Sequence, residues 1–365
     1  MMSSSFQHRE VKPPEGLWVS RTEAADAEML ARGAYQPLTG FMNQDEYRAV
    51  VDSLHLPSGA LFPLPIVLSV PEKIARRLMV GEILDIHDGT GFVAEVWVTQ
   101  VFRRDLDQEA SRVYGTVSRE HPGVAVLQDH SPWCVAGPVR VAKSVASPYP
   151  EPAWPQQVKD WIRQQGWSTV TFFQTRNPTH RAHEYLLKVA LEMTDGLVLH
   201  PLVGPTKSDD VPPAVRMTAY RTLIREYFPS EHILLATFGA AMRYAGPREA
   251  VFHGLVRKNY GATHFIVGRD AAGVGNFYEA DSARRLFESL AEELGIVPLT
   301  FDKIGYCPKC LGMASIRSCP HSDAWFSMSG TMVRTLLTQA KRPPVEVMRP
   351  EIADILLERC QSGDS

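Results

Sequence analysis

The residues with the clearest chemical potential stand in the run FFQTRNPTHRAHEYLLK, residues 172–188. An apolar stretch ends at Phe173, and a polar segment with Gln174, Arg176 and Asn177 leads into an amphipathic helical pattern. A planar guanidinium can bind an oxyanion through two parallel hydrogen bonds, and the amide side chains add neutral donors. A helix N-terminus offers further N–H groups and a partial positive charge. The run therefore predicts a strand-to-helix turn that binds an anion.

Two histidines follow in the same run. His180 and His183 are three residues apart, so both lie on one face of the first helical turn. The segment from Gln174 onward has no acidic residue before Glu184, which keeps it cationic. Three interpretations stay open from these residues alone: a polar surface loop, a metal site with the imidazoles as ligands, and a phosphate-binding turn. The cationic surroundings and the lack of a third ligand nearby argue against the metal site.

Two further runs place polar residues after predicted strands. The run HPLVGPTKSDDVP supplies Lys207, for which a solvent-exposed lysine is the alternative interpretation. In the run THFIVGRDAAGVG, Gly268 follows a predicted strand and allows a close approach of the backbone. Arg269 and Asp270 come next, at the end of the strand where the ligands of parallel sheets lie.

The run SMSGTMVRTLL, residues 327–337, has the pattern of a capped helix. Ser329 or Thr331 can accept N–H bonds of the first turn, and Gly330 leaves room there for a phosphate. Arg334 lies one turn further along. A capped helix without any ligand is the alternative interpretation.

A cluster of thiols stands in the run CPKCLGMASIRSCPH, with Cys307, Cys310, Cys319 and His321. These residues suit a tetrahedral zinc ion, and four protein ligands would complete its shell, so the site would be structural. Asp323 is an alternative fourth ligand, because the spacing between the last two members is tight. A redox-active C-x-x-C is the rival interpretation, but that motif normally opens a helix and lacks the extra ligands. The zinc site is expected to join the central domain to the C-terminal segment.

The elements that must position these residues predict an α/β protein with several domains. The chain has 365 residues, more than the ~250–300 at which one core usually stops growing. Residues 1–150 hold strand-like runs (LFPLPIVLSV, EILDIHD, FVAEVWVTQVFR, VRVAKSV) and two helical patterns (TEAADAEMLARGA, NQDEYRAVVDSL), which predicts a β-rich domain. The Pro-rich run SPYPEPAWP, residues 147–155, is the predicted linker. Strands then alternate with helices through residues 151–324, which indicates a parallel sheet, and residues 325–365 are mostly helical.

The composition argues against several classes of protein. A net charge of −3 gives no general attraction to nucleic acid or to an anionic membrane. No apolar run reaches the ~18 residues of a transmembrane helix, and the first residues, MMSSSFQHREVKPPEG, lack the apolar part of a secretory signal. The five cysteines are an odd, sparse set, unlike a secreted disulfide framework, so a cytoplasmic setting is expected.

The run QTRNPTHRAHEYLLK resembles the Q-x-R-N-P-x-H-x-x-H signature of the ATP sulfurylases, or sulfate adenylyltransferases. That signature is a relative of the H-x-G-H turn of nucleotidylyl transferases. The runs YQPLTGFM, HPLVGPTKSDDVP, THFIVGRDAAGVG and SMSGTMVRTLL are similar to further segments of the family, so the resemblance spans about residues 35–335. Some bacterial members carry a similar cysteine-rich zinc insertion. The chain departs from the family's usual G-R-D-H-A-G at Ala271, where His is common, so only a backbone contact to the nucleotide is expected there.

The resemblance implies a PUA-like β-rich domain, a Rossmann-like catalytic domain and a small C-terminal helical segment, in a homodimer. It implies that ATP and sulfate react to give adenosine 5′-phosphosulfate and pyrophosphate, that sulfate attacks the α-phosphorus directly, and that Mg²⁺ accompanies ATP. Sulfate would be held by Gln174, Arg176 and the Ala272 amide. Catalysis would depend on Thr175, Arg176, Asn177, His180 and His183. ATP would contact these residues together with Gln174, Gly268, Arg269, Asp270 and Ala271. Further candidates for phosphate contacts are Lys207, Ser329, Gly330, Thr331 and Arg334.

Two other functions stay open at this point. One is a different nucleotidylyl transferase, which would use the same histidine turn with another acceptor. The other is a nucleotide-binding protein without catalysis, held together by zinc. The sequence contains no G-x-x-x-x-G-K-[ST] run, so the fused adenylylsulfate kinase of some relatives is not expected.

Overall fold

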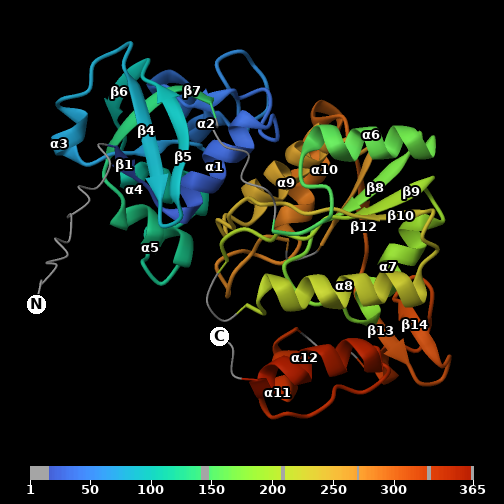
Figure 1. Cartoon of the computed structure of the whole chain (residues 1–365). Coiled ribbons are helices and arrows are strands. Elements are labelled where there is room, and N and C mark those ends of the chain that lie inside the picture. Colours follow the sequence, from blue (N-terminus) through green and yellow to red (C-terminus); the bar gives the residue numbers. More distant parts are fainter. Residues whose placement is uncertain (1–15, 141–147, 207–209, 269–270, 327–329, 363–365) are drawn as a thin grey trace, which may run out of the picture.

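The computed structural model describes residues 16–140, 148–206, 210–268, 271–326 and 330–362. Lys207, Arg269, Asp270 and Ser329 therefore lie outside the described residues. A β-rich N-terminal domain, a central domain with helices on both faces of a sheet, and a helical C-terminal segment are separately visible (Figure 1). These three parts are the predicted fold class.

The N-terminal sheet is organised around one long strand, β7. It pairs antiparallel with β2, β3, β5 and β6, and β4 and β1 extend the sheet beyond β5. Adjacent strands approach closely where two glycines meet, because a Cβ on Gly40 would lie 2.2 Å from the carbonyl oxygen of Gly137. The strands are β1 Leu17–Trp18, β2 Gly40–Phe41, β3 Leu68–Ser69, β4 Ile83–Asp88, β5 Gly91–Trp97, β6 Gln100–Arg103 and β7 Trp133–Arg140.

The helices of this domain include two that the sequence predicts, and both begin with reciprocal caps. In α1 (Arg21–Ala31) Ser20 and Glu23 bond each other's backbone N–H groups, and in α2 (Gln44–Ser53) Asn43 and Glu46 do the same. The sequence does not reveal the shorter helices α3 Glu72–Ala75, α4 Leu106–Glu109, the π-helical turn Ala110–Tyr114 and α5 Pro122–Asp129.

Two of the predicted strands in this domain are wrong in extent. Of the run LFPLPIVLSV, only Leu68–Ser69 forms a strand, because prolines at 63 and 65 lack the N–H group that a ladder needs. The run FVAEVWVTQVFR forms the two strands β5 and β6 instead of one. The remainder of the first run is nevertheless buried, with Leu64 and Ile66 fully inside the core.

The described part of the predicted linker is packed against the central domain. Glu151 accepts two hydrogen bonds from Arg221, at 2.5 and 2.9 Å. The carbonyl of Pro152 accepts the amide of Thr237 at 2.9 Å. This connection is therefore an anchored segment rather than a free one.

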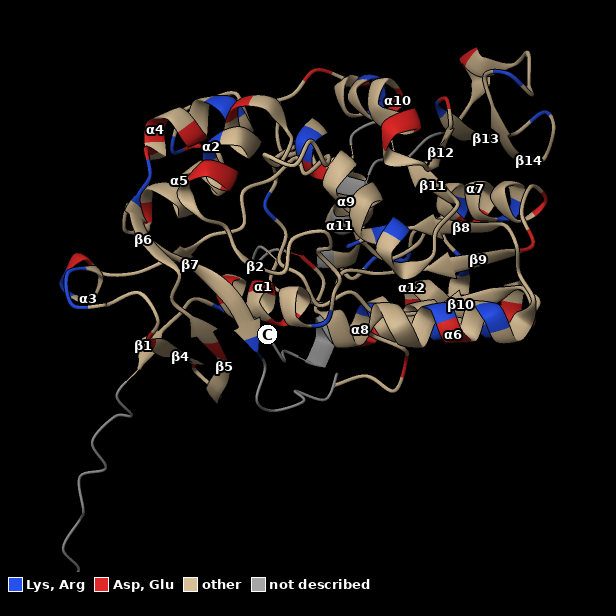
Figure 2. Cartoon of the chain, turned by 90° about the horizontal axis from the view of Figure 1, so that it is seen from above, with Lys and Arg blue, Asp and Glu red and all other residues tan. Residues whose placement is uncertain are grey.

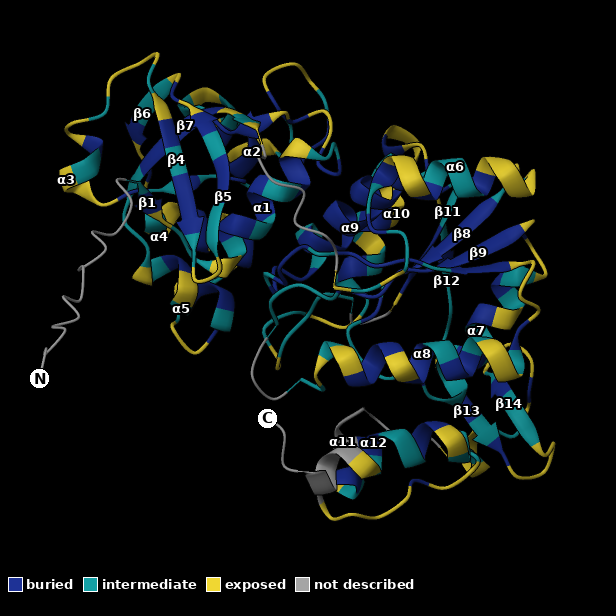
Figure 3. Cartoon of the chain, viewed as in Figure 1, coloured by how far each residue is buried: buried dark blue, intermediate teal, exposed yellow. Residues whose placement is uncertain are grey.

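The central sheet is parallel throughout, in the order β10-β9-β8-β11-β12. Its strands are β8 Val170–Phe173, β9 Gly196–Leu199, β10 Ile233–Leu235, β11 His264–Val267 and β12 Val297–Thr300. The helices are α6 Pro155–Gln165, α7 Arg181–Leu191, α8 Pro213–Tyr227, α9 Pro247–Tyr260 and α10 Ser282–Leu294. Strand and helix alternate as the sequence predicts. Strands β8, β9, β10 and β11 are almost entirely buried, whereas β12 at the edge of the sheet is partly exposed (Figure 3).

Successive residues of the strands serve different cores. Phe172 packs in a core with α6, α9 and α10 that continues into the N-terminal domain, whereas Phe173 packs in a second core with α7, α8 and the C-terminal helices. Each such aromatic side chain contributes about 1.5–3 kcal/mol by burial. Because side chains alternate along a strand, Phe172 and Phe173 face opposite sides of the sheet at the carboxyl end of β8.

The C-terminal part consists of a hairpin and two helices. The hairpin joins β13 Ile304–Cys307 to β14 Gly312–Ser315, and a 3-10 turn follows at Ser322–Ala324. The helices are α11 Gly330–Thr338 and α12 Pro350–Ser362, and α12 packs beside α8 (Figure 1). Among the described residues, no helix combines the length and the apolar character that a membrane span requires.

Candidate active site

A cavity of about 370 Å³ lies beyond the carboxyl ends of β8 and β11, where ligands of open parallel sheets bind. The turn after β8, the turn after β11 and helix α11 each contribute to its wall. The sequence-predicted residues that line it are Gln174, Thr175, Arg176, Asn177, His180, His183, Gly268, Ala271 and Ala272. Segments that are about ninety residues apart in the chain thus meet at one place.

The turn after β8 is stabilised from within. The Thr175 hydroxyl accepts the Asn177 amide and donates to the Asn177 carbonyl, both at 3.1 Å. The hydroxyl of Tyr220 donates to the same carbonyl at 2.7 Å. Thr175 is buried, so its hydroxyl holds the turn, and the Asn177 side chain is carried at the cavity wall on a fixed backbone.

His180 and His183 form a stacked pair at the start of α7. Their ring centroids are 3.9 Å apart, with an angle of 20° between the planes. Burial lowers the pKa of His180 to about 4. Burial, with a smaller contribution from His180, also holds the pKa of His183 well below its ordinary value. Both rings are therefore neutral near pH 7, and each can donate one N–H. The Nδ1 atom of His183 has no hydrogen-bond partner in the described part of the chain.

Arg176 is held over an aromatic ring at the edge of the cavity. Its guanidinium carbon lies 5.0 Å from the ring centroid of Tyr244, within the range of a cation–π contact. Its Nε lies 3.7 Å from Oδ2 of Asp210, and the Asp210 side chain is only 1% exposed. The sequence analysis missed both partners. Asp210 lies in the run HPLVGPTKSDDVP, which the sequence already assigns to the site, so it could have been included as a candidate. No sequence motif indicates that Tyr244 belongs to the site.

The described part of the turn after β11 is held by backbone hydrogen bonds. The amide of Ala271 donates to the carbonyl of Gly268 at 3.2 Å. Ala272 has a φ of 56°, a left-handed conformation that a non-glycine residue adopts only at a cost. Its carbonyl accepts the amide of Gly246 at 3.1 Å, which fixes the plane of the turn.

His253 of α9 also lines the cavity, and the sequence analysis missed it. Its Nε2 lies 3.7 Å from Oε1 of Glu249, and both side chains are almost fully buried. Burial is the main cause that holds its pKa well below the ordinary value. The signal was the spacing of Glu249, His253 and Arg257, which repeats every four residues with only apolar residues and Gly254 between them.

The C-terminal segment closes one side of the cavity. Val333 and Leu337 of α11 are part of its lining. The Arg349 guanidinium donates to both carboxylate oxygens of Glu184 in α7, at 2.7 and 2.9 Å. The amide of Arg181 donates to the carbonyl of Val347 at 2.7 Å. The first turn of α7 is thus bonded to the connection between α11 and α12. Gly330, Thr331 and Arg334 belong to α11, but their side chains lie outside the described part.

The cysteine cluster forms a separate centre on the β13–β14 hairpin. Ligand atoms of Cys307, Cys310, Cys319 and His321 all lie within 4.8 Å of one another. The Sγ atoms of Cys310 and Cys319 are 3.7 Å apart, and the three Sγ atoms lie 3.5–3.7 Å from Nδ1 of His321. A tetrahedral ion with Zn–S bonds of about 2.3 Å separates its sulfurs by about 3.8 Å. This group could hold a metal ion without Asp323.

Charge is not concentrated on any one helix of the central domain. Figure 2 shows Lys and Arg interspersed with Asp and Glu over the helices, in agreement with the net charge of −3. Among the described residues, the groups of the cavity that can attract an anion include Arg176 and the N-terminus of α7.

Comparison with known proteins agrees with the arrangement of the domains. The ATP-sulfurylase family model matches residues 152–359, and the PUA-like domain model matches residues 4–144. A solved structure, the hexameric APS kinase from Thiobacillus denitrificans, superposes with a TM-score of 0.74 at 22% identity. That match covers 94% of this chain and 63% of the other, and it supports the fold alone.

Proteins named sulfate adenylyltransferase are similar over nearly the whole chain. The one from Symbiobacterium thermophilum is 50% identical over 345 residues, which cover 93% of this chain and 88% of the relative. The one from Acaryochloris marina is 46% identical over 346 residues, with coverages of 93% and 88%. The one from Deinococcus radiodurans is 45% identical over 354 residues, with coverages of 96% and 91%. This chain belongs to the ATP-sulfurylase family.

Proposed function

We propose that the protein is a sulfate adenylyltransferase, which converts ATP and sulfate reversibly to adenosine 5′-phosphosulfate and pyrophosphate. The observation that carries this proposal is the meeting of Arg176 and Gln174 with the stacked histidines and the Ala272 turn in one cavity. A turn that binds only the phosphates of a nucleotide would not need a second anion site. Arg176 beside this turn supplies such a site, and a second anionic substrate, sulfate, can bind there.

The reaction needs positioning rather than proton transfer. A sulfate oxygen attacks the α-phosphorus of ATP, an S–O–P linkage forms, and the bond from the α-phosphorus to the bridging oxygen breaks in line. The electron pair leaves with pyrophosphate. Sulfate is already an anion, so no general base is required, and catalysis consists of bringing two anions together and stabilising the spreading charge.

The described residues divide this task between them. Arg176 and Gln174 would hold sulfate, and the Ala272 amide would add a backbone contact. Asn177 would orient the α- and β-phosphates on the turn that Thr175 stabilises. His180 and His183, as neutral donors, would stabilise charge on the phosphate oxygens without exchanging protons.

The remaining contacts concern the nucleotide. Backbone from Gly268 to Ala271 would contact ATP, with Arg269 as a further anion contact. ATP would enter as its Mg²⁺ complex, as nucleotides usually do. The residues proposed as further phosphate contacts are Lys207, Ser329, Gly330, Thr331 and Arg334.

The decisive experiment is the formation of ATP from adenosine 5′-phosphosulfate and pyrophosphate. We expect rapid, enzyme-dependent ATP formation, and we expect pyrophosphate to exchange into ATP only when sulfate is present. Exchange without sulfate would point to a nucleotidylyl transferase with another acceptor. ATP binding with no exchange under any condition would leave a non-catalytic nucleotide-binding protein.

We further propose that the Cys3His group holds a structural zinc ion, since its ligand distances fit a closed tetrahedral shell. We also propose that the protein is a cytoplasmic homodimer. Its domains would span residues 1–150, 151–324 and 325–365. Light scattering on the purified protein tests the dimer, and limited proteolysis tests the boundaries.

A further inference from the structure

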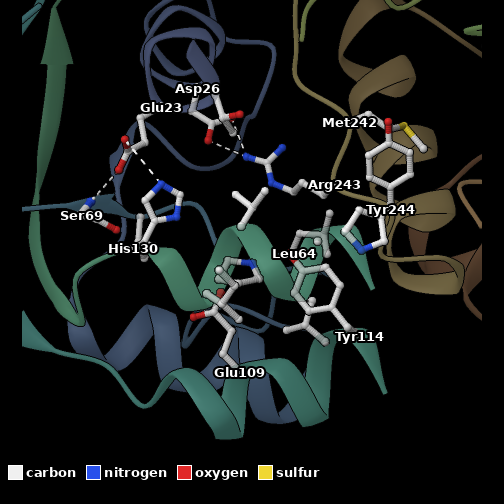
Figure 4. A pocket seen from close by; sticks show the side chains of 18 of the residues that line it. Glu23, Asp26, Leu64, Ser69, Glu109, Tyr114, His130, Met242, Arg243 and Tyr244 are labelled. Carbon is white, nitrogen blue, oxygen red and sulfur yellow. Dashed lines mark hydrogen bonds and ion pairs between the residues drawn. The ribbon is translucent and has the colours of Figure 1, made fainter. Parts of the chain in front are cut away.

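A second cavity, of about 260 Å³, lies at the junction of the N-terminal and central domains (Figure 4). Residues of segment 241–246 line it. Met242 lines both cavities, whereas Arg243 and Tyr244 line only the second. The segment therefore borders both cavities. It is almost entirely buried, and Glu249 of α9 accepts the amides of Arg243 and Ala245 at 2.8 and 2.9 Å. These bonds hold its backbone from within the central domain.

A side-chain contact to the segment comes from the N-terminal domain. Nη2 of Arg243 lies 2.6 and 2.5 Å from the two carboxylate oxygens of Asp26 in α1. The Tyr35 hydroxyl donates to the same carboxylate at 3.1 Å. The side chains of the ion pair are 11% and 4% exposed, so little water competes with it, and the interaction is much stronger than a surface ion pair.

The same segment contacts two of the three groups that are proposed to bind sulfate, Arg176 and the Ala272 turn. The ring of Tyr244 lies under the Arg176 guanidinium at 5.0 Å. The amide of Gly246 donates to the carbonyl of Ala272 at 3.1 Å. A shift of this segment would therefore move the side-chain contact and the backbone contact to sulfate together.

Other charged groups around the second cavity do not call for a ligand. Arg104 is paired with Glu109 at 3.1 Å, and Glu23 lies 4.0 Å from His130. Since Asp26 and Arg243 are also paired, the charged side chains that line the second cavity lie beside one another in pairs. The function of the Asp26–Arg243 pair is thus to be sought in the segment that it holds.

We propose that Asp26 and Arg243 are positioning residues for the sulfate site. Through this pair the N-terminal domain fixes segment 241–246, and the segment fixes Arg176 and the Ala272 turn. The inference rests on the proposed function. It gives the PUA-like domain a defined part in the reaction, which is to set the affinity for sulfate without touching either substrate.

The test compares Asp26→Asn with Glu109→Gln in steady-state kinetics, each substrate being varied in turn. Both substitutions neutralise a carboxylate of the N-terminal domain that takes part in a buried ion pair. Only Asp26 is paired with a residue of segment 241–246. We expect Asp26→Asn to raise the KM for sulfate about tenfold, which is less than the full loss of a desolvated cation–π contact would cause, with less than a twofold change in the KM for ATP. Asp26→Glu, which keeps the charge, should restore most of the sulfate affinity.

Glu109→Gln should lower the thermal stability without a selective effect on sulfate. Equal effects of the two variants, or an unchanged sulfate KM in Asp26→Asn, would overturn the inference. If Asp26→Asn does not fold, Tyr244→Leu tests the same connection from the central domain, and an unchanged sulfate KM there would also overturn it. A wild-type enzyme without sulfate-dependent pyrophosphate release would instead refute the proposed function, so the two failures are distinguishable.

Discussion

His180 and His183 stack at the start of α7, with ring centroids 3.9 Å apart. Two cationic imidazoles would repel each other at this distance, so the stacked geometry agrees with the pKa values, which burial lowers for both rings. Neutral rings can approach a polyanion as hydrogen-bond donors and need not lose a proton when the product leaves. The pair therefore suits a reaction in which charge moves but protons do not.

The lowered histidine pKa values predict that acid destabilises the protein. In the unfolded chain the ordinary pKa is about 6.5, whereas His180 in the fold has a pKa of about 4. Between these values the unfolded chain binds more protons, so the free energy of unfolding falls as the pH falls from about 6.5 toward 4. For His180 the slope is at most about 1.4 kcal/mol per pH unit. Urea unfolding of the wild type and of His180→Gln across this range should show a shallower slope in the variant, and parallel slopes would refute the assignment.

Replacing Arg176 should abolish most turnover and leave the fold intact. Arg176→Ala removes the guanidinium proposed to bind sulfate, and loss of one oriented charge-stabilising group typically costs about 100- to 1,000-fold in rate. Arg176→Lys should recover little, because an ammonium cannot form the paired hydrogen bonds. Arg163→Ala, on the exposed face of α6, is the control. A pyrophosphate-release assay near wild-type activity for Arg176→Ala would disprove the role.

Asp210 should weaken sulfate binding in the wild type. Its buried carboxylate lies 3.7 Å from Nε of Arg176, and neither of its oxygens has a hydrogen-bond partner among the described residues. Sulfate must approach the same guanidinium against this negative charge. Asp210→Asn should lower the sulfate KM by about fivefold, which corresponds to roughly 1 kcal/mol of relieved repulsion. Asp160→Asn on the surface of α6 should change nothing, and a higher sulfate KM in Asp210→Asn would show that the carboxylate orients Arg176 instead.

The sequence predicts local features of the site well because they depend on neighbours in the chain. The strand before Gln174, the helix after His180 and the spacing of the four zinc-ligand candidates all follow from short-range patterns, and the structure has each of them. The partners of these residues come from packing between distant segments. Tyr244 reaches Arg176 only through the fold, and nothing in the sequence connects Asp26 with Arg243. Likewise, the run LFPLPIVLSV is predicted to be a strand, but most of it is buried without forming one, since burial does not require a strand.

Removal of the metal should lower stability more than it changes chemistry. The purified protein should contain about one zinc per chain, and Cys310→Ser should lose it, because three ligands form a much weaker site. We expect the Tm to fall by several degrees, as for the loss of a few kcal/mol, with little change in the KM of either substrate for the folded fraction. Chelation followed by addition of zinc should restore the Tm. A protein without metal, whose thiol count changes with oxidant, would favour a redox-active pair.

The Arg349–Glu184 pair should stabilise the closed arrangement of the C-terminal segment. Arg349 also stacks on the ring of Tyr227 at 3.9 Å. Although partial burial raises the pKa of Glu184, hydrogen bonds from Arg349 and Lys188 lower it below its ordinary value. On acidification the unfolded chain therefore binds the proton of Glu184 before the folded chain does. The stabilisation from this pair is complete above the ordinary pKa of the carboxyl group and is lost as the pH falls below it.

Arg349→Ala should lower the free energy of unfolding by about 1–3 kcal/mol near pH 7 and by less at low pH. Arg342→Ala, which breaks an exposed ion pair with Asp354, should cost under about 0.5 kcal/mol. Equal losses in the two variants, measured by urea unfolding, would show that the buried position of Glu184 adds nothing to the pair.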